Sequence, residues 1–139
     1  MANSGWVTHR GEKVTMSAER IVLIVDDDHA VLETMQMLLE GKGGFRVHCS
    51  VGAHGAARCL SAHRRVDIVI ADVILAGEIS GVDVCRMARR LHPQVGLVVI
   101  SADPKVEQET LPEQSVYLRK PFGGDDLTQA IEQALVLVA

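Results

Sequence analysis

The chain has 139 residues, of which 47% are hydrophobic, 23% charged and 3% aromatic, so it is long enough for one soluble domain and too short for two of ordinary size. Its formal net charge of -4 and the lack of a cluster of basic residues argue against nucleic acid as a partner. The apolar runs are too short to span a bilayer and no apolar signal core precedes residue 21, so we expect a cytoplasmic protein without a membrane partner.

The cysteines predict no disulfide framework. Cys49, Cys59 and Cys85 are an odd number and form no CxxC pair. We interpret them as reduced thiols, which agrees with a reducing cytoplasm.

Residues 1–19 are expected to form a disordered N-terminal lead. They are mostly polar, contain two glycines and show the period of neither a strand nor a helix. Because Met16 is followed by SAER and an apolar strand, residues 1–15 could also be an extension upstream of the native start. The folded domain is predicted over residues 20–139.

From residue 20 onwards, strand patterns alternate with helical patterns. Runs rich in β-branched and other apolar residues at 21–25, 66–71 and 95–100 indicate buried strands, and shorter strands are predicted at 45–49 and 115–118. Helices are predicted from Val31 to near Gly41 and at 53–62, 82–91 and 127–138. This alternation predicts an α/β fold with a doubly wound parallel sheet that carries helices on both faces.

The segment between Ser101 and Tyr117 predicts an irregular element. Pro104 suits a first helical position, whereas Pro112 does not allow an undistorted helix to continue through it. The remaining residues, 105–111, allow roughly two turns and contain only two apolar side chains. We therefore predict a fourth helix that is short or irregular, with high mobility.

Polar side chains follow four of the five predicted strands. Asp26, Asp27 and Asp28 follow the first strand, Asp72 the third, Ser101 the fourth and Lys120, after two residues, the fifth. The carboxyl ends of parallel strands meet at one edge of a sheet, where ligands bind. Neighbouring carboxylates repel each other unless a cation neutralises them, and oxygen ligands favour Mg2+. A carboxylate facing that ion can accept a phosphoryl group, whose oxygens Lys120 and the Ser101 hydroxyl would stabilise.

Four sequence runs carry a resemblance to a known family. The runs VLIVDDD, DIVIADVIL, VVISAD and YLRKPF, in this order, resemble the receiver domains of two-component response regulators. The resemblance covers residues 20–138 and implies a flavodoxin-like sheet of five strands in the order 2-1-3-4-5. It also implies a role for each matching residue: Asp72 as phosphoacceptor, Asp27 as direct Mg2+ ligand, Asp26 as its acidic partner acting through water, the Ile74 carbonyl as third protein ligand, Ser101 as switch hydroxyl, Lys120 as active-site lysine and Tyr117 as switch aromatic. In this family the Lys120–Pro121 peptide bond is often cis.

The resemblance further implies a stand-alone response regulator. It would receive its phosphoryl group from a sensor histidine kinase or a histidine phosphotransfer protein and would then change its contacts with an unknown downstream protein. It would be no conventional enzyme, although it would promote Mg2+-dependent phosphorylation and dephosphorylation of Asp72. No output domain follows residue 139, so we expect signalling through protein contacts.

Two positions depart from the family pattern. The position four after Asp72 is usually proline and here is Ala76, and the glycine usually eight after it is Gly81, nine after it. The loop therefore has one extra residue and is expected to be less rigid. Gly77, Ser80 and Gly81 are interpreted as its flexible turn.

Alternatives remain for single residues and for the function. We interpret Asp28 as a helix N-cap or first-turn acid in preference to a third ligand, and Tyr117 could be an ordinary strand aromatic. A haloacid-dehalogenase-type phosphatase needs DxDx[TV], which Ala30 does not match. A nucleotide-binding fold needs a glycine-rich turn where the three aspartates stand. A pseudo-receiver, a binding module that works without phosphorylation, is the main alternative.

Overall fold

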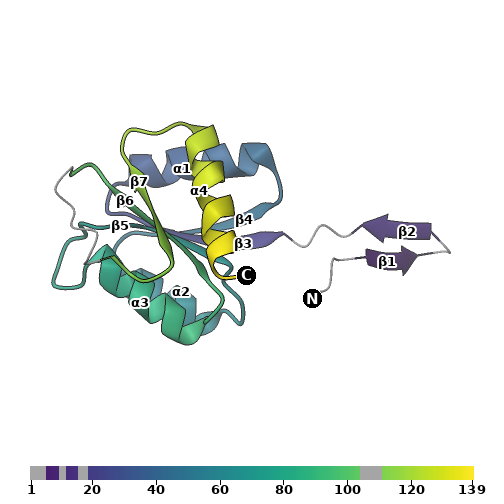
Figure 1. The fold of residues 1–139 in the computed structure, drawn as a ribbon, viewed down its shortest axis with the longest axis horizontal. Helices are drawn as coiled ribbons and strands as arrows, with labels where there is room; N and C mark the ends of the chain where they lie inside the picture. The colour runs from purple at the N-terminus through teal and green to yellow at the C-terminus, as the bar shows by residue number, and fades with distance from the viewer. Residues whose placement is uncertain (1–5, 10–11, 16–18, 104–110) are drawn as a thin grey trace.

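The computed structural model describes residues 6–9, 12–15, 19–103 and 111–139. Its centre is a five-stranded parallel sheet covered by helices on both faces (Figure 1). The strands are β3 (Arg20–Val25), β4 (Phe45–Ser50), β5 (Ile68–Asp72), β6 (Gly96–Ser101) and β7 (Ser115–Arg119), and the helices are α1 (His29–Lys42), α2 (Ala53–Ala62), α3 (Gly81–Leu91) and α4 (Gly124–Leu137). The strand order β4-β3-β5-β6-β7 confirms the predicted 2-1-3-4-5 arrangement of a doubly wound α/β sheet.

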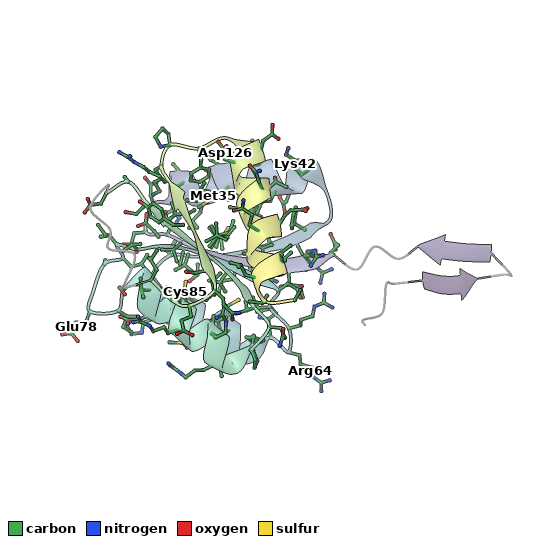
Figure 2. The ribbon with its side chains drawn as sticks, viewed as in Figure 1. Met35, Lys42, Arg64, Glu78, Cys85 and Asp126 are labelled. Atoms are coloured by element: carbon green, nitrogen blue, oxygen red, sulfur yellow. The ribbon has the colours of Figure 1, made fainter. Side chains whose placement is uncertain are left out.

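The sheet separates two hydrophobic clusters. Alternate residues of each central strand point to opposite faces, so that in β3 Leu23 packs under α2 and α3 while Ile24 packs under α1 and α4. Met35 of α1 and Cys85 of α3 are buried on the sheet-facing sides of their helices, whereas Glu78 lies at the periphery (Figure 2). Because both faces are covered, the central strands consist of continuous apolar runs, as the sequence predicted.

Local capping explains where two helices begin. The Asp28 carboxylate accepts a hydrogen bond from the Ala30 amide at 2.8 Å, which confirms Asp28 as the N-cap of α1. The side chains of Ser80 and Asp83 form a reciprocal capping box at the start of α3. The hydrogen bonds that the Asp83 carboxylate accepts from the Ser80 amide and hydroxyl hold its pKa below the usual value.

The strand register aligns the carboxyl ends of four strands. Val25 pairs with Ala71, Asp72 with Ile100, and Ser101 with Arg119. The residues that follow these positions therefore leave the sheet at one edge, which is where the sequence placed the candidate site.

The N-terminal segment contains two short strands. β1 (Trp6–His9) pairs antiparallel with β2 (Glu12–Thr15) outside the five-stranded sheet. The division into a lead and a domain starting at residue 20 stays a prediction.

The predicted short helix at residues 105–111 falls almost entirely on residues 104–110, which lie outside the described residues. Leu111 is described and packs, half-buried, against the cluster under α2 and α3. None of the helices within the described ranges is long and apolar enough to cross a membrane.

Candidate functional site

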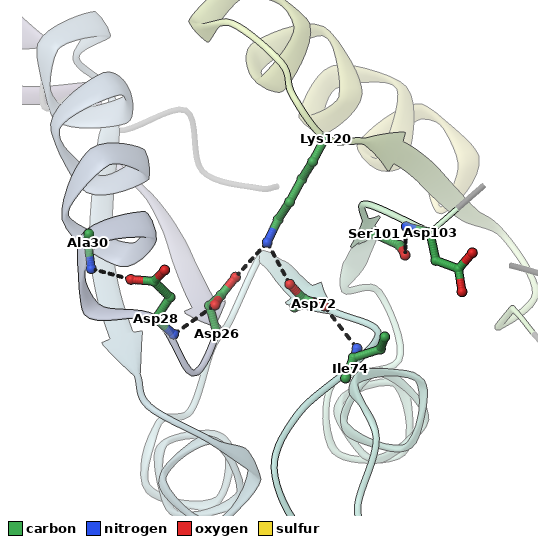
Figure 3. A network of polar contacts seen from close by, with 8 residues as sticks. All are labelled: Asp26, Asp28, Ala30, Asp72, Ile74, Ser101, Asp103 and Lys120. Carbon is green, nitrogen blue, oxygen red and sulfur yellow. Dashed lines mark hydrogen bonds and ion pairs between the residues drawn. The ribbon is translucent and has the colours of Figure 1, made fainter. Parts of the chain in front are cut away.

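Three charged side chains from different strand ends meet at the carboxyl edge of the sheet. The Lys120 ammonium nitrogen lies 2.7 Å from Asp72 Oδ2 and 3.3 Å from Asp26 Oδ2 (Figure 3). The side chains of Asp26, Asp72 and Lys120 are 6%, 14% and 25% exposed, so the cluster is shielded from bulk water. The Lys120 amide also donates to the Ser101 carbonyl at 3.0 Å, which continues the β6–β7 pairing up to the lysine.

The surroundings of the cluster shift two pKa values. Burial raises the pKa of Asp26, and the Asp72 carboxylate adds to this, while the Asp28 amide and Lys120 oppose it. Burial alone would lower the pKa of Lys120, but its hydrogen bond to Asp72 and the charges of Asp72 and Asp26 raise the pKa above its usual value. The lysine is therefore charged at neutral pH and neutralises part of the acidic cluster.

Each of the three predicted site carboxylates accepts one backbone N–H bond. The Asp28 amide donates to Asp26 Oδ1 at 2.9 Å, and the Ile74 amide donates to Asp72 Oδ1 at 2.9 Å. The Ala76 amide donates to Asp27 Oδ2, which links the β5–α3 loop to the end of β3. The orientation of the carboxylates is thus set by the backbone of the loops that follow β3 and β5.

The donor set suits a hard cation in its chemistry. The proposed ligands are all oxygen atoms, and an ionised carboxylate has acceptor capacity beyond one N–H bond. In the described ranges, however, no group of three or more His, Cys, Asp or Glu side chains is arranged so that it could hold a metal ion, and Lys120 bridges Asp26 and Asp72. The residues therefore fit Mg2+ by donor type, whereas the ligand set itself, with the Ile74 carbonyl, stays a prediction.

Ser101 and Tyr117 form a neighbouring group. Ser101 is 1% exposed, and its hydroxyl oxygen accepts a hydrogen bond from the Asp103 amide at 2.9 Å. The half-buried Tyr117 donates its hydroxyl to the Asp103 carbonyl at 3.2 Å. Among the described residues, no hydrogen bond joins either side chain to Asp72. The two predicted switch residues are instead connected to each other through Asp103.

Gly81 contributes to the site in a way that the sequence interpretation missed. A Cβ atom at this position would lie 1.7 Å from the Asp72 carbonyl oxygen, so the first residue of α3 packs directly against the backbone of Asp72. The interpretation of Ser80 and Gly81 as part of a flexible turn was therefore wrong. The signal was present, because Ser80 followed by Asp83 three residues later is a capping pattern.

Comparison with protein families gives a match over most of the chain. The family model described as response regulator receiver domain matches residues 22–132. Response regulator protein TmoT of Ectopseudomonas mendocina is 33% identical over 122 residues, which cover 86% of this chain and 54% of that protein. The nitrogen assimilation regulatory protein NtrX of Azorhizobium caulinodans is 30% identical over 118 residues, or 82% of this chain and 26% of that protein. The chain thus spans about half or less of these relatives.

Solved structures show the same fold. The crystal structure of a response regulator receiver protein from Sinorhizobium medicae matches with a TM-score of 0.77 and 27% identity, and the match covers 86% of this chain and 96% of that one. A CheY-like receiver domain protein from Methanospirillum hungatei matches with a TM-score of 0.74 at 22% identity, which supports the fold alone.

Proposed function

The chain belongs to the response regulator receiver domain family of two-component systems, and on this premise we propose that Asp72 is its phosphoacceptor. The observation that carries the proposal is the contact of 2.7 Å between Lys120 Nζ and Asp72 Oδ2. A shielded carboxylate beside a fixed cation is a suitable acceptor, because the cation is already in place for the negative charge that arrives with the phosphoryl group.

The proposed reaction is phosphoryl transfer to a carboxylate. An oxygen of Asp72 forms a bond to phosphorus as the bond from phosphorus to the donor's histidine nitrogen breaks, which leaves an acyl phosphate and a neutral imidazole after proton uptake. Lys120 stabilises the phosphoryl oxygens, and the Ile74 amide keeps one carboxylate oxygen in a fixed orientation. The donor would be a sensor histidine kinase or a histidine phosphotransfer protein.

Mg2+ would be held by Asp26, Asp27, Asp72 and the Ile74 carbonyl. When bound, it would neutralise the phosphoryl oxygens and relieve the repulsion among the carboxylates. Burial raises the pKa of Asp26, so ionising this carboxylate is costly. A cation bound beside it would offset that cost.

Ser101 and Tyr117 are the proposed switch pair. If the Ser101 side chain rotated to donate its O–H to a phosphoryl oxygen, its oxygen would move away from the Asp103 amide from which it now accepts a hydrogen bond. Because Tyr117 also binds Asp103, this change would be transmitted to the chain that follows residue 103 and to β7. The output would then be an altered contact with an unknown downstream protein, in the cytoplasm.

Incubation with acetyl phosphate and Mg2+ tests the proposal. Intact mass should show one added phosphoryl group that is lost in base, and Asp72→Asn should take up none. Asp28→Asn is the matched control, because asparagine also caps helices and Asp28 is not a proposed ligand. Wild-type labelling of Asp72→Asn would refute the acceptor. A wild-type protein that takes up no phosphoryl group would favour the alternative of a binding module that works without phosphorylation.

A further inference from the structure

The loop between β5 and α3 contacts a proposed metal ligand that follows β3. The Ala76 amide donates a hydrogen bond to Asp27 Oδ2, although the two residues are 49 positions apart. Ala76 stands where the family pattern usually has proline, and proline has no N–H to donate. The contact is therefore available to this chain because of its departure from the pattern.

The contact occupies one of the two Asp27 carboxylate oxygens and leaves the other available to a metal ion. No described residue donates to the other oxygen, Oδ1, and a Cβ atom added to Gly52 would lie 3.7 Å from it. Asp27 itself is exposed, so without the Ala76 amide its side chain would be free to rotate in water. The amide thus holds one oxygen, Oδ2, and leaves Oδ1 without a donor among the described residues.

We propose that the Ala76 amide is a positioning donor that holds the Asp27 carboxylate ready for a divalent cation. The inference rests on the proposed function, which makes Asp27 a direct ligand of Mg2+. Carboxylates that bind metals are commonly held by such outer hydrogen bonds, and the loss of one typically weakens metal binding 10- to 100-fold. The same bond ties the β5–α3 loop to the end of β3.

The opposite reading is that the amide competes with the cation. A competing amide would have to leave Asp27 when Mg2+ binds, whereas a positioning amide keeps its bond because it uses only Oδ2. The two readings predict opposite changes at one atom, the Ala76 amide hydrogen.

NMR hydrogen exchange of the Ala76 amide in the wild-type protein separates them. Protection should be present without metal, should be lost in Asp27→Ala, and should be kept or increased when Mg2+ is added. Loss of protection on adding Mg2+ would overturn the proposal, as would an unprotected amide in the metal-free protein. This measurement needs no change to the loop, so it holds even if a loop variant folds poorly.

Mg2+ titration of Ala76→Pro, followed by chemical shifts, gives the second test. Proline removes the N–H and also fixes φ at a negative value. Ala76 is not among the described residues with positive φ, so proline is tolerated there more readily than at Gly77. We expect its affinity for Mg2+ to fall about tenfold, while Ala76→Ser, which keeps the N–H, retains wild-type affinity. Equal or tighter binding by the proline variant would overturn this inference alone, whereas a wild-type protein that does not bind Mg2+ would overturn the proposed metal site as well.

Discussion

Replacing Gly81 by alanine should damage the fold at the proposed phosphoacceptor. The new Cβ would lie 1.7 Å from the Asp72 carbonyl oxygen and 2.6 Å from its carbon, both of them backbone atoms that cannot rotate away. Real Cβ contacts do not fall below 3.0 Å, so α3 and β5 would have to separate by roughly 1.3 Å.

Such a separation would lower the free energy of unfolding through overpacking and through the loss of one hydrogen bond. Overpacking a tightly packed position costs about 1–3 kcal/mol. The hydrogen bond from the Gly81 amide to the Val73 carbonyl, now 3.0 Å long, would be lost and adds about 1 kcal/mol. We therefore expect Gly81→Ala to lower the free energy of unfolding by about 2–4 kcal/mol. Phosphorylation of Asp72 should slow as well, since its backbone is one side of the clash.

Urea unfolding followed by circular dichroism measures this change. Gly41→Ala is the matched control, because Gly41 lies inside α1 and a Cβ there meets nothing within 4 Å. The control should be stabilised by about 0.5–1 kcal/mol, since alanine is the better helix former. If the midpoint of urea unfolding of Gly81→Ala were equal to or higher than that of the wild type, the inferred close contact between α3 and the Asp72 backbone would be refuted.

Three further predictions concern other parts of the molecule. Ile74 is exposed, and its side chain cannot hydrogen-bond a water that attacks the acyl phosphate, so Ile74→Asn should dephosphorylate faster than the wild type. Equal or slower decay of the acyl phosphate in the variant would contradict this. Burial raises the pKa of Cys85 to about 12, so iodoacetamide at pH 8 should modify the exposed Cys49 and spare Cys85, as peptide mapping would show. Burial raises the pKa of Asp26 above 3.8, so without metal the ionisation of this carboxylate destabilises the folded protein as the pH rises past that value. Asp26→Asn should therefore be more stable than the wild type at pH 7 in EDTA, and its advantage should shrink towards pH 4.

The sheet and its helices could be predicted because their signals are local. Continuous β-branched runs mark strands covered on both faces, and each strand end is followed at once by its polar residues. Asp28 could be identified as a cap for the same reason, since the cap and its helix are adjacent in sequence. With the resemblance, the parallel order of the strands then brought Asp26, Asp72 and Lys120 to one edge.

The contacts that orient the site could not be predicted, because they join distant parts of the chain. The Lys120 contact with Asp72 spans 48 positions and the Ala76 contact with Asp27 spans 49. Nothing in the local sequence states which backbone amide meets which carboxylate oxygen. Gly81 shows the same limit, because its need for glycine comes from the Asp72 backbone and not from its own turn.

The β5–α3 loop, which has one residue more than the family pattern, is held at both ends beside the proposed acceptor. The loop is fixed at its start by the bond from the Ile74 amide to Asp72, and at its end by the bond from the Gly81 amide to Val73. Between these points Gly77 is exposed, has a φ of 94° and has open space around its Cβ position, so this stretch can change length at the surface. A change of length there alters which backbone group faces Asp27, while Asp72 remains held by β5, β6 and α3. The placement of the acceptor and the orientation of the proposed metal ligand are therefore separate features of this chain, and a substitution in the loop can change the second without the first.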